Sequence, residues 1–267
     1  MNLEDEQILN LAIILSVIIG LAVGSFLNVL IYRIPRKEPI GKDRSRCPKC
    51  KNQIENMDNI PVLSYLALRG KCRSCHEHIS IKYPLVEALT AVVWGVTVWR
   101  VGVHLHTIGY LIFFSALIAL TFIDLEHMLL PKKIIYPAGI TLILFTVISS
   151  IINSELFRIR DSLIVGIAYF CFFYLMWEAT KRRAMGFGDV RLSFFLGFAM
   201  GYYGFIVSYT GLLLSFFFGA FIGFIVAFLT SGGRKMKIPF GPFLAMGTIV
   251  VIWCAPAISD LVKSYYA

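Results

Sequence analysis

Charged residues are scarce in this chain. Only 15% of its 267 residues are Asp, Glu, Lys or Arg, whereas 58% are hydrophobic, and the mean hydropathy is +0.75. Soluble proteins ordinarily contain about 25% charged and about 45–50% apolar residues. This shortage of charge argues against a soluble domain, and a soluble all-helical core is the weaker alternative because apolar runs of roughly 20 residues recur throughout.

Three familiar patterns are missing as well. The sequence has no HExxH motif, which disfavours a zinc metalloprotease, and no GxGxxG loop, which leaves no sign of a soluble-type cofactor fold. No basic segment precedes the first apolar stretch, since Glu4, Asp5 and Glu6 stand there instead. We therefore expect no cleaved signal peptide.

What the chain has instead is a series of apolar segments bounded by polar residues or turn formers. Each is predicted to cross a membrane as a helix. The predicted spans are residues 8–32, 84–99, 107–123, 134–152, 162–180, 190–204, 205–230 and 240–260. The predicted fold class is an all-α polytopic membrane protein with about eight transmembrane helices, the sixth of them short and followed by a tight turn at 201–204.

The basic residues are unevenly distributed between the connections. The net charge is +9, and all but four of the 25 Lys and Arg residues fall on one side of the predicted topology. The positive-inside rule places that side in the cytoplasm and both termini outside. The excess charge is thus interpreted as a signal of orientation in a lipid bilayer, and no nucleic-acid partner is expected.

One long polar segment interrupts this pattern, at about residues 33–83. It contains two CxxC pairs, Cys47 with Cys50 and Cys72 with Cys75. Four thiolates close a tetrahedral zinc site without an open position, so the predicted role of the metal is structural. Two disulfides are the alternative, which reducing cytoplasmic conditions disfavour. The predicted domains are a first transmembrane helix (1–32), a zinc-ribbon-like cytoplasmic loop (33–83) and a seven-helix membrane catalytic domain (84–267).

Acidic residues in or beside membrane spans are candidates for function because burying a charge there is costly. Five qualify: Glu87, Asp124, Glu126, Glu178 and Asp189. Asp124 ends the third predicted span and Asp189 begins the sixth, at the same cytoplasmic boundary. Two aspartates from separate helices can share one proton and activate a water, which is the chemistry of an aspartic protease. Gly186 and Gly188 would let the backbone bend and a substrate strand approach.

Other interpretations of these acids remain open. Asp189 could simply cap a helix. A transporter that relays protons or cations is the alternative from a different class, but it predicts acids near the bilayer midplane on broken helices. Glu87 could pair with Lys82 or a neighbouring helix.

Five stretches, in order, resemble the type IV prepilin peptidases, which are inner-membrane leader peptidases and N-methyltransferases. They are GSFLNVLIYRIPR (24–36), the cysteine loop with the following helix start (47–87), DLEHMLLP (124–131), GFGDVRL (186–192) and IPFGPFLAMG (238–247). The third and fourth resemble the family's two aspartate motifs, the fourth being its GxGD signature.

The resemblance implies a bifunctional enzyme of the bacterial inner membrane. It implies that the substrate is a type IV prepilin or a type II secretion pseudopilin precursor, whose basic leader is removed at the cytoplasmic face. It also implies methylation of the new N-terminus with S-adenosylmethionine as the donor. In such an enzyme Glu87 could hold the ammonium group of the substrate or the sulfonium group of the donor. A shorter peptidase without methyl transfer is the alternative within the family.

Overall fold

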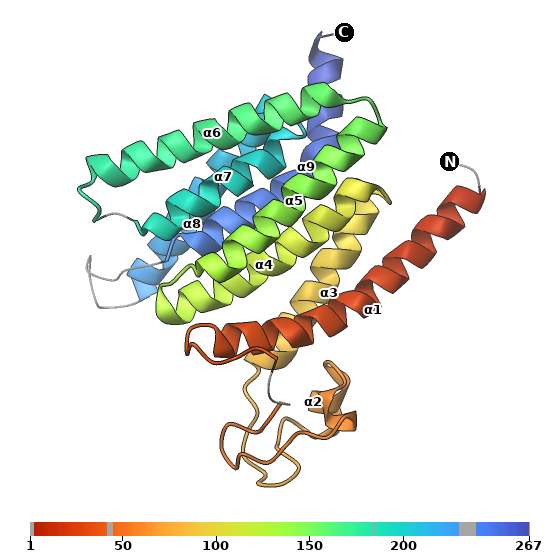
Figure 1. Ribbon diagram of the computed structural model, residues 1–267, viewed down its shortest axis with the longest axis vertical. Helices are drawn as coiled ribbons and strands as arrows, with labels where there is room; N and C mark the ends of the chain where they lie inside the picture. Colours follow the sequence, from red (N-terminus) through yellow and green to blue (C-terminus); the bar gives the residue numbers. More distant parts are fainter. Residues whose placement is uncertain (1–2, 42–44, 184, 230–238, 267) are drawn as a thin grey trace. The chain divides into compact units, whose positions relative to one another are not determined.

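A computed structural model describes residues 3–41, 45–183, 185–229 and 239–266 (Figure 1). Its described part is helical, and strand pairing there is limited to two isolated bridges, Arg46 with Gln53 and Lys71 with His78. The predicted all-α class is confirmed. The predicted cytoplasmic Arg234, Lys235 and Lys237, and the start of the fifth motif at Ile238, lie outside the described residues.

The long helices follow the predicted spans closely. They are α1 (Leu3–Arg33), α3 (Lys82–Val101), α4 (Leu105–His127), α5 (Lys132–Ile152), α6 (Leu156–Ala179), α7 (Phe187–Gly201), α8 (Phe205–Leu229) and α9 (Gly241–Tyr266). Of the described helices, all of these except α7 are long and apolar enough to cross a membrane, which makes seven. The 15 residues of α7 reach about 22 Å at about 1.5 Å per residue, less than a hydrocarbon core of about 30 Å.

The chain divides into two compact units, unit 1 (Met1–Val103) and unit 2 (His104–Ala267). In unit 1, α1 packs along α3 because glycines on α1 let the two backbones approach. A Cβ at Gly20 would lie 2.9 Å from the Cα of Ala91, and one at Gly24 would lie 2.6 Å from the Cα of Glu87. The polar loop between them holds the short elements η1 (Met57–Asn59) and α2 (Leu63–Ala67). The predicted domain boundaries near residues 32 and 83 stay a prediction.

In unit 2, α4 is the central helix. Inside its most apolar window 72% of the residues are buried, compared with 6% for α8. Its fully buried side chains include Tyr110, Phe114 and Leu117. In Figure 1, α5 and α9 lie beside α4, while α8 lies against α9. The apolar surface of α8 therefore remains available to lipid.

The pairing of α6 with α7 depends on two glycines spaced four residues apart. A Cβ at Gly197 would lie 2.8 Å from the carbonyl oxygen of Val165, and one at Gly201 would lie 2.7 Å from the Cα of Ser162. Small residues at this spacing are a common device for close helix packing in membranes. This contact fixes α7, and hence the helix start that carries Asp189.

A polar cluster joins the helix ends far from Asp189, namely the starts of α4 and α6 and the ends of α5 and α7. Arg158 forms an ion pair with Glu155 at 2.8 Å and donates a hydrogen bond to the carbonyl of Tyr202 at 3.3 Å. His106 and Ser149 lie 3.2 Å apart at their polar side-chain atoms. The charges at this end are thus mutually compensated.

We expect Gly201→Ala to destabilise unit 2 because the added methyl group would force α6 and α7 apart. Overpacking of this kind costs about 1–3 kcal/mol, so the thermal unfolding midpoint of the protein in detergent should fall. Gly41→Ala is the control, because no described atom lies within 4 Å of a Cβ at that position. Equal midpoints for both variants would contradict the packing.

Candidate active site and metal centre

Asp124 lies one turn before the end of α4. Its side chain is buried, with 6% of the residue exposed. The carboxylate accepts a backbone hydrogen bond from Gly241, the first residue of α9. A Cβ at Gly241 would lie 2.7 Å from Oδ2 of Asp124, so glycine is the residue that lets the start of α9 approach this carboxylate.

Asp189 is the third residue of α7. Its Oδ2 accepts the N–H of Gly186 at 3.2 Å, and Gly186 precedes the helix as its N-cap. The predicted capping role is therefore real. It uses only one oxygen, however, because the buried Oδ1 has no hydrogen-bond partner within the described residues. A buried polar atom without a partner is uncommon, so we expect Oδ1 to bind a water molecule or a group of the substrate.

The structure brings Asp124 and Asp189 together, close enough for their charges to interact. Leu130, which follows α4, packs between the two helix starts. A Cβ at Gly188 would lie 2.8 Å from the Cβ of Leu130, and one at Gly241 would lie 3.4 Å from its Cδ2. The end of α4 and the starts of α7 and α9 thus meet around two buried carboxylates. Such a pair can hold one proton and bind a water molecule.

The two glycines predicted beside Asp189 differ in what they contribute. Gly186 has φ −77° and ψ 150°, a conformation that any residue adopts. Gly188 is needed for its contact with Leu130. Their role in the approach of a substrate stays a prediction. Gly241 and Leu130 were not predicted as site residues, although the motif at 238–247 was a signal for the former.

Glu87 lies in unit 1, in the second turn of α3, and is buried. Its Oε2 accepts the N–H of Val62 at 2.8 Å, and Ser25 and Asn28 of α1 also donate to it. Within the described residues these partners are neutral, and Lys82 is not among them. Glu87 therefore ties α3 to α1 and to the polar loop.

The four loop cysteines form one cluster. Their sulfur atoms all lie within 4.8 Å of one another, and all four are free thiols. The sulfurs of Cys47 and Cys75 are 3.9 Å apart. Zn–S bonds of about 2.3 Å in a tetrahedron require sulfurs about 3.8 Å apart, so the cluster fits a four-thiolate metal site. His76 and His78 do not belong to it.

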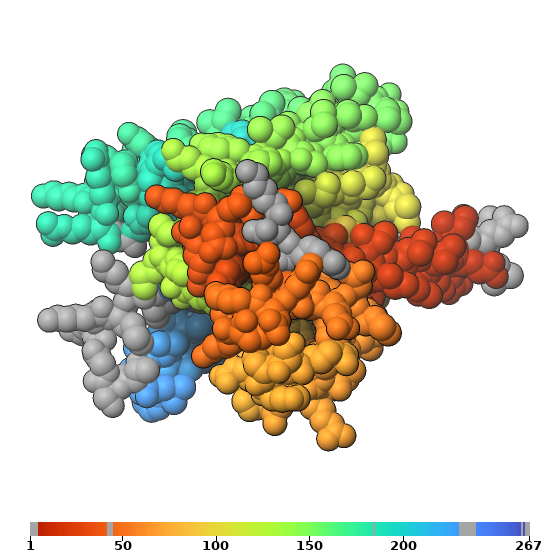
Figure 2. All heavy atoms as spheres, turned by 60° about the horizontal axis from the view of Figure 1, so that its bottom comes forward, coloured from red at the N-terminus to blue at the C-terminus, as the bar shows by residue number. Residues whose placement is uncertain are grey.

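The loop that carries this cluster is drawn in orange in Figure 2, and its own hydrogen bonds surround the cysteines. Backbone N–H groups of Cys75 and Ser74 donate toward the sulfur of Cys72 and lower its pKa, so that this thiol is the one that ionises more readily than an ordinary cysteine. The thiolate is the form that binds metal. Arg73 donates two hydrogen bonds to Asp58, at 2.6 and 2.8 Å. These bonds hold the pKa of Asp58 below its ordinary value and fix the second cysteine pair to η1.

Together, the helical fold and the paired carboxylates describe a multi-pass membrane protein with an aspartate site at its helix ends. A profile of the bacterial peptidase A24 N-terminal domain matches residues 18–101, and one of the type IV leader peptidase family matches residues 111–228. The chain belongs to the type IV leader peptidase family.

Curated relatives named prepilin leader peptidase/N-methyltransferase are similar along most of the chain. The Pseudomonas aeruginosa protein is 33% identical over 90% of this chain and 90% of its own length. The Aeromonas hydrophila protein is 34% identical over 88% of each chain, and the Neisseria gonorrhoeae protein is 32% identical over 93% of each chain. No solved structure matches this chain.

We expect Cys72→Ser to lose bound metal, because it removes one of four ligands from a site that should hold about one ion per chain. Cys171→Ser is the matched control, since that thiol lies exposed on α6. Elemental analysis of the purified proteins measures the difference. Full metal content in Cys72→Ser would contradict the four-cysteine site.

Proposed function

We propose that this protein is a membrane aspartic endopeptidase that removes the basic leader from type IV prepilins or type II secretion pseudopilins. The observation that carries the proposal is the pair of buried carboxylates, Asp124 and Asp189, at the junction of three helix ends. The names of the relatives support the same activity and add N-methylation of the product. A transporter is not favoured, because the two acids lie at helix ends.

In the proposed mechanism, Asp124 and Asp189 share one proton and hold a water between them. The ionised carboxylate takes a proton from the water while the water oxygen bonds to the scissile carbonyl carbon. The protonated carboxyl donates to the developing oxyanion. When the C–N bond breaks, a proton passes to the leaving amine. Of the two Asp189 oxygens, Oδ1 is the one proposed to bind the water, because Oδ2 already accepts the N–H of Gly186.

We propose zinc as the metal of the cysteine cluster, because thiolate ligands in this geometry suit it. Four ligands leave no open position, so the metal would stabilise the loop without entering the reaction. A loop of this size has little core of its own and needs such a crosslink. In this view residues 33–83 form a small metal-dependent domain between the first helix and the seven-helix catalytic part.

S-adenosylmethionine would supply a methyl group to the N-terminal amine that cleavage creates. The amine, after losing one proton to water, forms the N–C bond while the C–S bond pair passes to sulfur. Glu87 is the proposed residue for this step, since its buried carboxylate suits either the substrate ammonium or the sulfonium. A peptidase without this second activity is the less favoured alternative.

We place the protein in the bacterial inner membrane with both termini outside. The basic loops and the cysteine domain then face the cytoplasm. Asp124 and Asp189 would lie at that same face, where the leader of a precursor ends and its hydrophobic helix begins. The proposed partner is therefore a single-span precursor held in the same bilayer.

We expect Asp124→Asn and Asp189→Asn each to abolish leader cleavage, because an amide can neither take a proton from water nor transfer one to the reacting groups. Cleavage of a pilin precursor in lipid vesicles is read from the product mass. Asp260→Asn is the control, as that carboxylate lies exposed near the end of α9. Normal cleavage by either of the first two variants would remove that residue from the mechanism.

Gly241→Ala tests the position of Asp124 without replacing either aspartate. Its methyl group would displace the side chain of Asp124, and a displacement of about 1 Å can cost about 100-fold in rate. We expect a large fall in kcat for cleavage with metal content unchanged, whereas Gly41→Ala should cleave normally. A kcat equal to that of the unmodified protein would show that the start of α9 does not position Asp124.

A further inference from the structure

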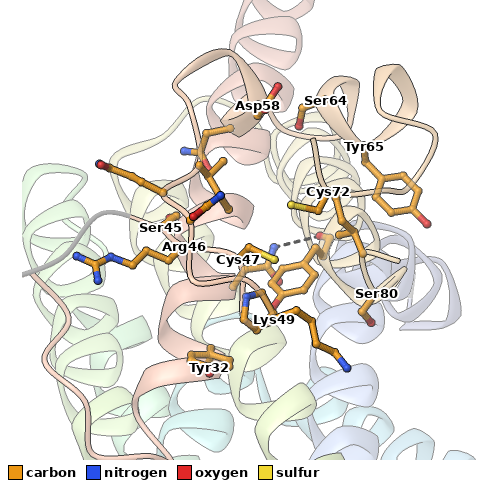
Figure 3. Close-up of a pocket in the computed structure, with 18 of the residues that line it drawn as sticks. Tyr32, Ser45, Arg46, Cys47, Lys49, Asp58, Ser64, Tyr65, Cys72 and Ser80 are labelled. Atoms are coloured by element: carbon orange, nitrogen blue, oxygen red, sulfur yellow. Dashed lines mark hydrogen bonds between the residues drawn. The ribbon is translucent and has the colours of Figure 1, made fainter. Parts of the chain in front are cut away.

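Unit 1 contains a cavity of about 690 Å³ that the peptidase mechanism does not use. It is bounded by α1, the polar loop and the start of α3, and Figure 3 shows Tyr32, Cys47 and Cys72 around it. Pockets for small molecules usually measure about 300–1,000 Å³. The cavity therefore lies within the size range of small-molecule binding sites.

The lining of this cavity is balanced in charge. Five basic and five acidic side chains contribute to it, together with the rings of Tyr32, Tyr65 and Tyr83. A polybasic leader would require a predominantly acidic wall. A ligand that carries both signs of charge and a flat aromatic group matches this lining better.

Glu87, from the start of α3, is one of the five acidic side chains that line the cavity. It is buried, with 9% of the residue exposed, whereas the other charged residues of the lining are at least partly exposed. Three neutral donors, from Val62, Ser25 and Asn28, surround its carboxylate. These donors satisfy the carboxylate oxygens but bring no positive charge. Because a buried carboxylate is costly to ionise without a counter-charge, a small cation bound here would stabilise its charged form.

The loop is held in an unusual conformation at this point. Val62, whose N–H binds Glu87, has φ +61° and ψ −48°. For a β-branched residue this is a strained conformation, costing of order 1–3 kcal/mol, and such strain gathers at ligand sites. The hydrogen bond to Glu87 helps to maintain it, so the carboxylate and the cavity wall are positioned together.

We propose that this cavity binds S-adenosylmethionine, with its sulfonium facing Glu87. The proposal rests on the methyltransferase part of the proposed function and gives that activity a location in unit 1. The sulfonium would supply the positive counter-charge that the neutral donors around Glu87 do not provide. The zwitterionic amino-acid part and the adenine suit the mixed charges and the tyrosine rings.

The test measures binding to the full-length, metal-loaded protein by calorimetry and requires no turnover. Three ligands are compared: S-adenosylmethionine, sinefungin, which has an amine-bearing carbon at the sulfur position, and S-adenosylhomocysteine, which has a neutral sulfur. We expect the two cationic ligands to bind about tenfold more tightly, and Glu87→Gln to abolish that preference. Glu178→Gln, at an exposed acid on α6, should retain it.

A second variant tests the location independently of charge. Ser64 of α2 lines the cavity, so Ser64→Trp should weaken all three ligands alike by filling it. Leu63→Trp on the same helix is the control, because Leu63 is exposed and outside the lining. Metal content reports whether each variant has folded.

The outcomes are separable from those of the peptidase proposal. Retention of the preference for cationic ligands in metal-loaded Glu87→Gln would overturn the assignment of Glu87, even if the protein cleaves precursors. Unchanged binding by Ser64→Trp would overturn the location. If Glu87→Gln loses the preference and Ser64→Trp loses binding, but the unmodified protein does not cleave the leader, the results would support the cavity and contradict the peptidase proposal.

Discussion

The structure depends on bringing two carboxylates, which repel when ionised, into one buried place at the ends of three helices. Close backbone contacts hold them there. Gly241 lets α9 reach Asp124, Gly188 lets α7 pack on Leu130, and Gly201 fixes the other end of α7 on α6. Because these contacts join backbone and short side chains, they limit how far the carboxylates can separate. In the proposed mechanism this repulsion is relieved because the two carboxylates share one proton, which is the state that peptide hydrolysis requires.

The polar loop of unit 1 is stabilised in a different way, because it has too few apolar residues to form a core of its own. The four cysteines and the ion pair of Arg73 with Asp58 hold the loop together. Glu87 then connects it to α3 through the N–H of Val62. The same carboxylate borders the cavity, so the interaction that orders the loop also prepares the proposed methyl-donor site. A metal at the cysteine cluster and Glu87 would then both stabilise the proposed binding site.

Much of this arrangement is predictable from the sequence, because apolar segments and CxxC pairs have strong local signals. The helices and the cysteine cluster follow directly, and Asp124 and Asp189 were selected from their positions at span ends. The sixth predicted span was expected to be short, and α7 is short: its 15 residues leave it outside the seven helices that are long enough to cross a membrane. The contacts of Gly241 and Leu130 and the strained Val62 were not predictable, because they arise from tertiary packing.

The most direct test is a structure of the protein in lipid with a non-cleavable prepilin peptide bound, in which a hydroxyl group replaces the scissile carbonyl. The measured quantity is the distance from that hydroxyl oxygen to the nearest oxygens of Asp124 and Asp189. We predict that both distances are about 2.5–3.0 Å, the length of hydrogen bonds between oxygens. A hydroxyl bound to only one aspartate, with the other turned into a separate cleft, would contradict the paired mechanism.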